Sequence, residues 1–299
     1  MVNPLLSVVI PVFNRPEDLV RALQSLTVQT ESNFEVIVVD DGSTADIKSV
    51  ADDYEAKLNL KYIRIENSGG PARPRNIGIQ ASQAIWISLL DSDDWWCPTR
   101  IDDVCRAIKK NPECDVFYHK LNVVSDNRYL QWWSTKILGH KMTGDPFVHL
   151  MTIGDALPNS SVVIRRSCFE TFGGFNESPE FASVEDFDYW LMLAKNKCRF
   201  KFINAKPGFY WLSTTGISAN PDRTVARNQL ILEKYLCNLD INHQKKAKSK
   251  FYYFAGSILY SVGKLTEALT YFERADQLVG LGLKAKRLWK IARIRFGLK

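Results

Sequence analysis

At 299 residues, with 45% hydrophobic and 24% charged residues, the chain has the composition of a globular protein that can build one large domain and an appendage. Its start lacks the pattern of a signal peptide and no run reaches the roughly 20 apolar residues of a membrane span, so we expect a cytoplasmic protein. The six cysteines show no C-x-x-C spacing, which argues against a zinc knuckle or a disulfide framework, and the net charge of +6 is concentrated after Lys245.

The first ninety residues alternate apolar runs with helical patterns. Continuously apolar runs predict buried parallel strands, because a strand that is covered on both faces has no polar side. The β-α-β-α-β order predicts an α/β fold, a Rossmann-like and mostly parallel sheet with helices on both faces. The expected strands are 6–13, 34–40, 60–67 and 84–91, and the expected helices begin near Pro16, Asp46 and Asn76.

The second half of the chain is less regular. Residues 115–124 predict a strand, residues 157–175 a strand followed by a short helix and a glycine turn, and residues 183–195 a helix. Beyond Asn220 only helical patterns remain. We therefore expect a main domain at 1–218 and a helical extension at 219–299.

The extension contains a predicted helical hairpin at 251–278. Its small and aromatic residues have the spacing of a tetratricopeptide unit. Since one such unit cannot bury its own face, the hairpin must pack on the main domain or on a partner. The residues that carry this pattern are Gly256, Gly263, Ala268, Phe272 and Ala275.

Polar residues follow three of the expected strands at the point where each strand ends. In open α/β sheets, ligands bind at the carboxyl ends of the strands, so these residues should meet at one edge. Loops are polar in any case, and chance placement is the alternative for a single pair. Three pairs in succession favour one site: Asn14 with Arg15, Asp40 with Asp41, and Asp91 with Asp93.

The segment "LLDSDDWW" places Asp91, Asp93 and Asp94 directly after an apolar run. Crowded carboxylates resist ionisation unless a cation or a hydrogen-bond donor joins them. A hard cation such as Mg²⁺ or Mn²⁺ takes oxygen ligands and bridges nucleotide phosphates. The alternatives are a cap for a helix that begins near Pro98, or a solvated turn. The apolar strand before the acids and the two companion clusters favour the cation.

Six segments together resemble the family 2 glycosyltransferases of the GT-A type, over roughly residues 5–215. They occur in the order and spacing that are typical of that family: "SVVIPVFNR", "VVDDGST", "GGPARPRNIGI", "LLDSDDWWCP", "GGFNES" and "VEDFDYWLMLAK". The resemblance implies a GT-A fold and a nucleotide-sugar donor, most simply a UDP-sugar. It also implies that Asp93 binds Mn²⁺ or Mg²⁺ on the diphosphate. The nucleotide-binding residues that it implies are Pro11, Phe13, Asn14, Asp41, Arg75 and Asp91, although Arg75 could instead be a surface arginine.

The same resemblance makes Asp186 the general base, because "VEDFDYW" is similar to the family's E-D motif. Inversion at the anomeric carbon requires a base for the acceptor hydroxyl, and no covalent intermediate is needed. Acids at a helix start also favour the helix dipole, which is the structural alternative for this cluster. The candidate acceptor or sugar contacts are Asp94, Gly173, Gly174, Glu185 and Trp190, and Trp190 could equally be a core residue.

One segment departs from the family pattern. Many relatives carry a basic or histidine residue near the position of "GFYWLSTTGIS" that reaches the diphosphate, and this segment contains none. Either Thr214 and Thr215 replace it by hydrogen bonding, or Arg223 does.

The end of the chain, 282–299, has seven cations and no acid. A helical wheel gathers apolar residues on one side and cations on the other, which is typical of a helix that lies in the surface of an anionic membrane. A solvated end, or a helix docked on the preceding hairpin, would explain the pattern as well. A nucleic-acid module is not indicated. The apolar side contains Leu281, Leu288, Trp289, Ala292, Phe296 and Leu298, and the basic side Lys286, Arg287, Lys290 and Arg293.

These expectations combine into an inverting, metal-dependent glycosyltransferase. Its acceptor would be a hydroxyl of a glycan or of a lipid-diphosphate-linked sugar in the synthesis of a bacterial surface polysaccharide such as O-antigen or capsule, at the inner face of the cell membrane. A sugar nucleotidyltransferase is the enzymatic alternative, but "PVFNRPEDL" lacks the glycine-rich loop that holds a triphosphate. A catalytically silent scaffold is the other alternative, and the intact acids argue against it.

Overall fold

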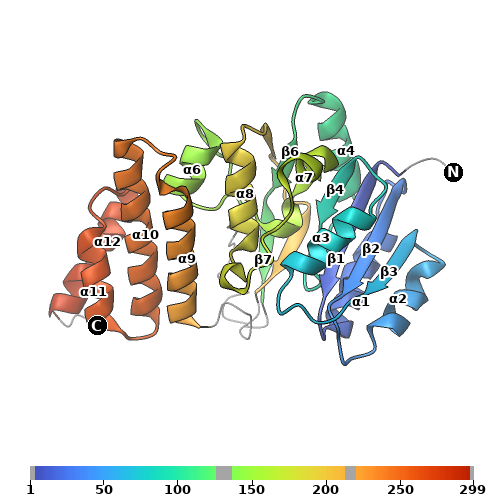
Figure 1. Ribbon diagram of the computed structural model, residues 1–299, viewed down its shortest axis with the longest axis horizontal. Helices are drawn as coiled ribbons and strands as arrows, with labels where there is room; N and C mark the ends of the chain where they lie inside the picture. Colours follow the sequence, from blue (N-terminus) through green and yellow to red (C-terminus); the bar gives the residue numbers. More distant parts are fainter. Residues whose placement is uncertain (1–3, 126–136, 213–219, 297–299) are drawn as a thin grey trace. The chain divides into compact units, whose positions relative to one another are not determined.

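The computed structural model describes residues 4–125, 137–212 and 220–296 (Figure 1). Its chain forms two compact units, one of residues 1–142 with 155–213 and one of residues 143–154 with 214–299. The expected boundary at 218–219 lies outside the described residues. Residues 143–154, which we assigned to the main domain, group with the second unit instead.

The first unit is built on a seven-stranded sheet in the order β10-β6-β9-β4-β1-β2-β3. All neighbouring strands are parallel except where β9 pairs with β4 and β6. The mixed α/β fold expected from the sequence is confirmed. The strands are β1 (Leu6–Val12), β2 (Phe34–Asp40), β3 (Leu60–Arg64), β4 (Trp86–Leu89), β6 (Val116–His119), β9 (Val163–Arg165) and β10 (Phe200–Ile203).

Helices cover both faces of this sheet, which is why its central strands are mostly apolar and buried at every position. Val8 and Ile10 belong to a core cluster that also contains residues of α1, α2 and α4. Val9 faces α3, where Gly78 lies so close that an added Cβ would overlap the Val9 side chain. Figure 1 shows α3 lying across β1 and β2. The helices are α1 (Pro16–Thr27), α2 (Ile47–Glu55), α3 (Ala72–Ala81), α4 (Arg100–Lys110), α7 (Arg166–Phe172) and α8 (Glu185–Lys195).

A second, four-stranded sheet lies in the same unit, in the order β5-β11-β7-β8. It contains the end of the segment that we expected to be a single strand, because the chain leaves the main sheet at Lys120 and β7 joins the smaller sheet. Gly208 lets β11 approach closely, since a Cβ there would lie 2.9 Å from Leu121 Cδ2 and from Trp96 Cδ1. The strands are β5 (Trp95–Trp96), β7 (Leu121–Val124), β8 (Ile137–Leu138) and β11 (Gly208–Trp211).

The second unit is helical in its described residues. The expected hairpin is present as α10 and α11, which pack together with Gly256 against Phe272 and with Gly263 in the connecting turn at φ +80°. Its likeness to a tetratricopeptide unit stays a prediction. Among the described residues, no helix has both the length and the hydropathy that crossing a bilayer requires. The helices are α6 (Pro146–Thr152), α9 (Pro221–Leu236), α10 (Ile241–Ser261), α11 (Leu265–Arg274) and α12 (Leu281–Phe296).

Candidate active site

The acidic turn follows β4 at the carboxyl edge of the sheet, next to the end of its parallel neighbour β1. The side chains of Asp91 and Asp93 remain 25% and 22% exposed, whereas Asp94 is fully buried. Burial raises the pKa of Asp93 and of Asp94, and the charge of Asp91 raises both further. Three acids are therefore crowded at this edge, and the two exposed carboxylates are the ones that a ligand can reach.

Asp94 has a structural role. Its Oδ1 accepts a hydrogen bond of 2.8 Å from the backbone amide of Trp211, which ties the acidic turn to β11. The side chain is completely buried, and the expectation that Asp94 contacts a sugar stays a prediction.

Arg75 joins the acidic turn to the E-D motif. Its Nη2 donates to Asp91 Oδ1 at 2.8 Å and its Nη1 donates to Glu185 Oε1 at 2.6 Å. Burial would lower the pKa of Arg75, but the charges of Asp91 and Glu185 outweigh it and raise that pKa above its ordinary value. The side chain is only 4% exposed, so the alternative of a surface arginine is excluded.

Asp91 has further partners in the same unit. Asn159 Nδ2 donates to Asp91 Oδ1 at 2.9 Å, and the Asp91 amide donates to Ser160 Oγ at 3.0 Å. This carboxylate is held in place from two sides before any ligand arrives.

Asp186 lies at the start of α8, beside the buried Glu185. Its side chain is half-buried and accepts a hydrogen bond of 2.7 Å from the Phe187 amide. Burial raises the pKa of Asp186 well above its ordinary value, and the charges of Glu185 and Asp155 raise it further. A helix dipole acting alone would lower this pKa. The raised pKa suits a general base, while Glu185 is occupied by Arg75.

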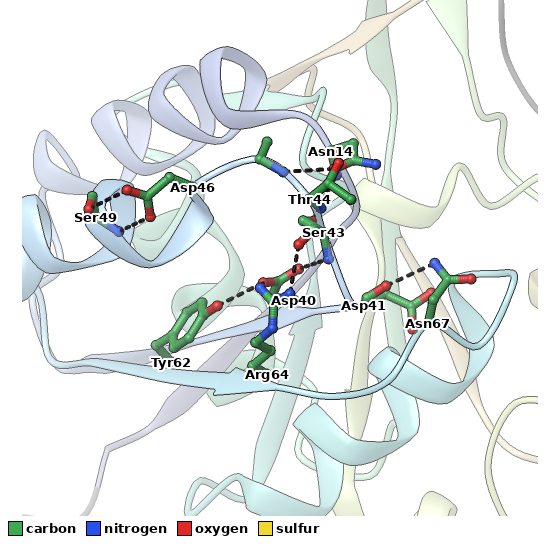
Figure 2. Close-up of polar contacts among 11 residues, drawn as sticks. Asn14, Asp40, Asp41, Ser43, Thr44, Asp46, Ser49, Tyr62, Arg64 and Asn67 are labelled. Atoms are coloured by element: carbon green, nitrogen blue, oxygen red, sulfur yellow. Dashed lines mark hydrogen bonds and ion pairs between the residues drawn. The ribbon is translucent and has the colours of Figure 1, made fainter.

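A network of hydrogen bonds shapes the loop after β2, where the sequence predicts the nucleotide base (Figure 2). Asn14 adopts a positive φ of 52° and its Oδ1 accepts from the amides of Thr44 at 2.8 Å and Ala45 at 3.1 Å. Asp40 is fully buried and accepts from Tyr62 and Arg64. Both side chains hold the loop in place, and the hydrogen bonds described here involve only groups of the protein.

Three other predicted nucleotide contacts lie near this loop. Asp41 accepts two hydrogen bonds of 2.8 Å from Ser68, and burial raises its pKa. Phe13 is 47% exposed, while Pro11 is buried within β1. The Asp41 amide donates to the carbonyl of Val12, the residue before Phe13, at 2.9 Å. An exposed aromatic ring can stack on a flat heterocycle, and a carboxylate can accept a hydrogen bond from one.

Two of the predicted acceptor contacts are packing residues. Trp190 is completely buried and packs against Phe175 and Tyr189, as the core alternative expects, and its contact with a sugar stays a prediction. Gly174 has no room for a Cβ because Asn76 Oδ1 lies against it. Asn76 in turn binds the Phe175 backbone through hydrogen bonds of 2.8 and 2.9 Å, which anchors this loop to α3.

Gly173 follows α7 with a φ of +85° and no atom within 4 Å of an added Cβ. Its role in acceptor binding stays a prediction. Three residues are candidates to replace the basic or histidine residue that reaches the diphosphate in many relatives. Thr214 and Thr215 lie outside the described residues, and Arg223 belongs to α9 in the second unit.

Tyr210 belongs to this region although no motif in the sequence points to it. Burial raises the pKa of its phenol, and the charges of four acids raise that pKa further. The acids are Asp94, Asp91, Asp93 and Asp186. No local pattern marks Tyr210, because it reaches this place through the antiparallel pairing of β11 with β5. That pairing joins segments more than a hundred residues apart.

The acids fit a hard divalent cation that takes only part of its ligands from the protein. In the described parts of the chain, no three His, Cys, Asp or Glu side chains gather in one place that could hold a metal ion. The side chains of Asp91 and Asp93 are still partly exposed, in a turn whose crowded charges favour a cation. Phosphate and water oxygens would have to complete the shell, as Mg²⁺ and Mn²⁺ accept.

A mostly parallel α/β sheet with an acidic turn at its carboxyl edge, facing an E-D motif at a helix start, is the arrangement of the GT-A glycosyltransferases. A family model described as Glycosyl transferase family 2 matches residues 7–170, which is more than half of the chain. The chain belongs to this family.

The known proteins that it resembles agree with this assignment. An "uncharacterized glycosyltransferase" of Haemophilus influenzae is 31% identical over 189 residues, which make up 63% of this chain and 62% of that protein. This chain thus spans about three fifths of that relative's length.

Two solved structures share the fold. The structure of S. aureus TarS 1–349 in complex with UDP-GlcNAc is 20% identical with a TM-score of 0.67, covering 98% of this chain and 90% of that chain. The mannosyltransferase PcManGT from Pyrobaculum calidifontis, in complex with GDP-Man and Mn²⁺, is 16% identical with a TM-score of 0.62, covering 99% and 84%.

Proposed function

We propose that this chain is an inverting glycosyltransferase that moves a sugar from a UDP-sugar to a hydroxyl of a glycan or lipid-linked acceptor in bacterial surface polysaccharide synthesis. The observation that carries the proposal is the buried Arg75, whose two ends bind Asp91 of the acidic turn and Glu185 of the E-D motif. One side chain thus joins the residues expected at the nucleotide to the helix that carries the expected base.

The residues have separate tasks in this proposal. Phe13 and Asp41 bind the base, and Asp91, fixed by Arg75 and Asn159, binds the ribose. Asp186 accepts the proton of the acceptor hydroxyl as that oxygen attacks the anomeric carbon on the face opposite the diphosphate. Glu185 positions α8 and does not take part in proton transfer. Mg²⁺ or Mn²⁺ bound by Asp93 would neutralise charge on the leaving diphosphate.

The choice of UDP rests on similar proteins. TarS has been crystallised with UDP-GlcNAc and PcManGT with GDP-Man. The first expectation is therefore a uridine nucleotide. A panel of nucleotide sugars tests this expectation. Slow transfer of the sugar to water would identify the donor even when the acceptor is not known. Release of GDP from GDP-mannose, with no release of UDP from any UDP-sugar, would exclude the uridine assignment.

Two variants test the assigned roles. Asp93→Ala is expected to abolish metal-dependent UDP release, and Asp186→Asn is expected to bind UDP nearly as the wild type does while transfer stops. Calorimetry with UDP, with and without Mn²⁺, measures binding, and product formation measures transfer. Full turnover by Asp186→Asn would refute the base assignment. A silent scaffold would show no metal-linked UDP binding, and a nucleotidyltransferase would consume UTP and a sugar phosphate.

The proposal also includes contact of α12 with an anionic membrane surface, where a lipid-linked acceptor would lie, because the apolar stripe of this helix is exposed. The helix docks on the hairpin through Ile291 and Ile294, and Lys290 lies 5.2 Å from the ring centre of Phe272. Docking therefore uses a different face from the apolar stripe that the sequence predicts, and it places Arg287 and Lys290 on the hairpin instead of on a solvated basic side.

The predicted stripe itself stays exposed. Its members include Leu281 at 84%, Leu288 at 60%, Trp289 at 55% and Phe296 at 75% exposed, while Leu298 lies outside the described residues. Lys286 and Arg293 border it on one side and Lys284 and Arg295 on the other, by the 100° spacing of a helix. Large apolar side chains between cations match the interface of an anionic bilayer better than a protein core.

Sedimentation with vesicles tests this membrane contact. The full chain should bind vesicles that contain phosphatidylglycerol more tightly than vesicles of phosphatidylcholine alone, and the double variant Leu288→Ser with Trp289→Ser should lose that binding. Ile241→Ser, which removes a side chain that is 72% exposed on α10, is the matched control. If the double variant instead abolishes a dimer seen by light scattering, the stripe binds a second copy and the membrane assignment is wrong.

A further inference from the structure

Asp93, the residue proposed to bind the divalent cation, already has a cationic partner. Arg15 Nη1 donates a hydrogen bond to Asp93 Oδ2. Arg15 is the N-cap residue of α1 and Asp93 lies in the turn after β4, 78 positions along the chain. The two meet because β1 and β4 are parallel neighbours whose carboxyl ends lie side by side.

The backbone of Asp93 is fixed independently of Arg15. Arg21 Nη2 donates to the Asp93 carbonyl oxygen at 2.8 Å and to Asp18 Oδ1 at 2.8 Å. The guanidinium of Arg21 also lies over the ring of Trp95 at 4.6 Å and over that of Trp211 at 4.9 Å. A change at Arg15 therefore leaves the turn itself in place.

Arg15, in contrast, can leave Asp93 at small cost. Its side chain is 33% exposed, and half-exposed ion pairs contribute little net free energy. It has a second anion nearby, since Asp18 Oδ2 lies 3.8 Å from Arg15 Nη1.

We propose that Arg15 is the counter-ion that occupies Asp93 until a divalent cation takes its place, so that the two cations compete for one carboxylate. This inference rests on the proposed function, in which Asp93 binds the metal. The competition makes the cation bind weakly to the free protein. A nucleoside diphosphate then favours metal binding in two ways, because it brings oxygen ligands for the metal and anionic oxygens for the displaced guanidinium. Arg15 thereby couples the binding of metal and donor.

Titration of the full chain with Mn²⁺, followed by the electron paramagnetic resonance signal of free Mn²⁺, tests the competition. Without nucleotide, Arg15→Gln should bind Mn²⁺ roughly three- to tenfold more tightly than the wild type, from the lost ion pair and the lost repulsion. Arg15→Lys should fall between the two. With UDP present, the gain in Mn²⁺ affinity should be larger for the wild type than for Arg15→Gln, because only the wild type has a guanidinium that the diphosphate can draw away from Asp93.

Two controls accompany the titration. Arg106→Gln removes the same charge from an ion pair on the surface of α4 and should leave Mn²⁺ affinity unchanged within about twofold. Asp93→Asn should abolish Mn²⁺ binding in both the wild-type and the Arg15→Gln background.

Equal or weaker Mn²⁺ binding by Arg15→Gln overturns the competition, and so does Mn²⁺ binding that survives Asp93→Asn. The first result leaves the metal-dependent transferase intact as long as the wild type binds Mn²⁺ together with UDP. Absence of Mn²⁺ binding with and without UDP overturns both proposals.

Discussion

The Arg75 bridge makes a quantitative prediction. Arg75→Met keeps an unbranched side chain but removes the guanidinium, which leaves Glu185, 3% exposed, without its cation. Removing one partner of a buried ion pair costs about 3–5 kcal/mol, because the other charge stays buried and uncompensated. At about 2–4 °C per kcal/mol for a domain of this size, the melting temperature should fall by roughly 6–20 °C.

Circular dichroism melts of three variants distinguish this mechanism from a general loss of packing. Arg73→Met, two residues earlier on the exposed side of the same helix, should melt within about 2 °C of the wild type. The double variant Arg75→Met with Glu185→Gln should regain part of the loss, because the orphaned charge is gone. If Arg75→Met melts like the wild type, or if the double variant is less stable than the single one, the bridge does not hold the site together.

Two further predictions concern Asp186 and Gly78. Because burial raises the pKa of Asp186 in the folded state, its ionisation opposes folding above its unfolded pKa of about 3.9, so Asp186→Asn should melt higher than the wild type near pH 7.5. That difference should shrink as the pH of the melts falls towards 4, and a difference that grows at low pH would refute the sign. Gly78→Ala should cost about 1–3 kcal/mol in urea unfolding, because its Cβ would overlap Val9, whereas Gly282→Ala, with open space around it, should cost nothing.

The main sheet could be predicted because its strands are local patterns. The runs that became β1 and β2 are mostly apolar, and every residue in them is buried. The strand at 115–124 was predicted as one piece because its apolar character continues across Lys120. What divides it is the pairing of β7 with β11, a contact between segments that lie about ninety residues apart.

In the candidate site, too, local patterns could be predicted from the sequence and long-range contacts could not. The apolar run before the acidic turn points to Asp91 and Asp93, whereas Asp186 is selected by the resemblance of "VEDFDYW" to the family's E-D motif. Which of the neighbouring polar residues reach the site, and which serve the fold, depends on partners elsewhere in the chain. Asp94 turned out to bind the Trp211 amide, and Trp190 turned inward onto Phe175.

Three arginines also depend on partners elsewhere in the chain. Arg15, Arg21 and Arg75 each bind the acidic turn or its continuation, and they come from α1 and α3, on opposite faces of the sheet. Arg75 is buried, Arg21 binds the acidic turn through the backbone carbonyl of Asp93, and Arg15 is partly exposed on the carboxylate expected to bind the metal. A cluster of acids at the edge of a sheet needs nearby positive charge both before its ligand binds and afterwards. The buried Arg75 can supply the positive charge that is present at all times, and only the partly exposed Arg15 is placed where a ligand can displace it.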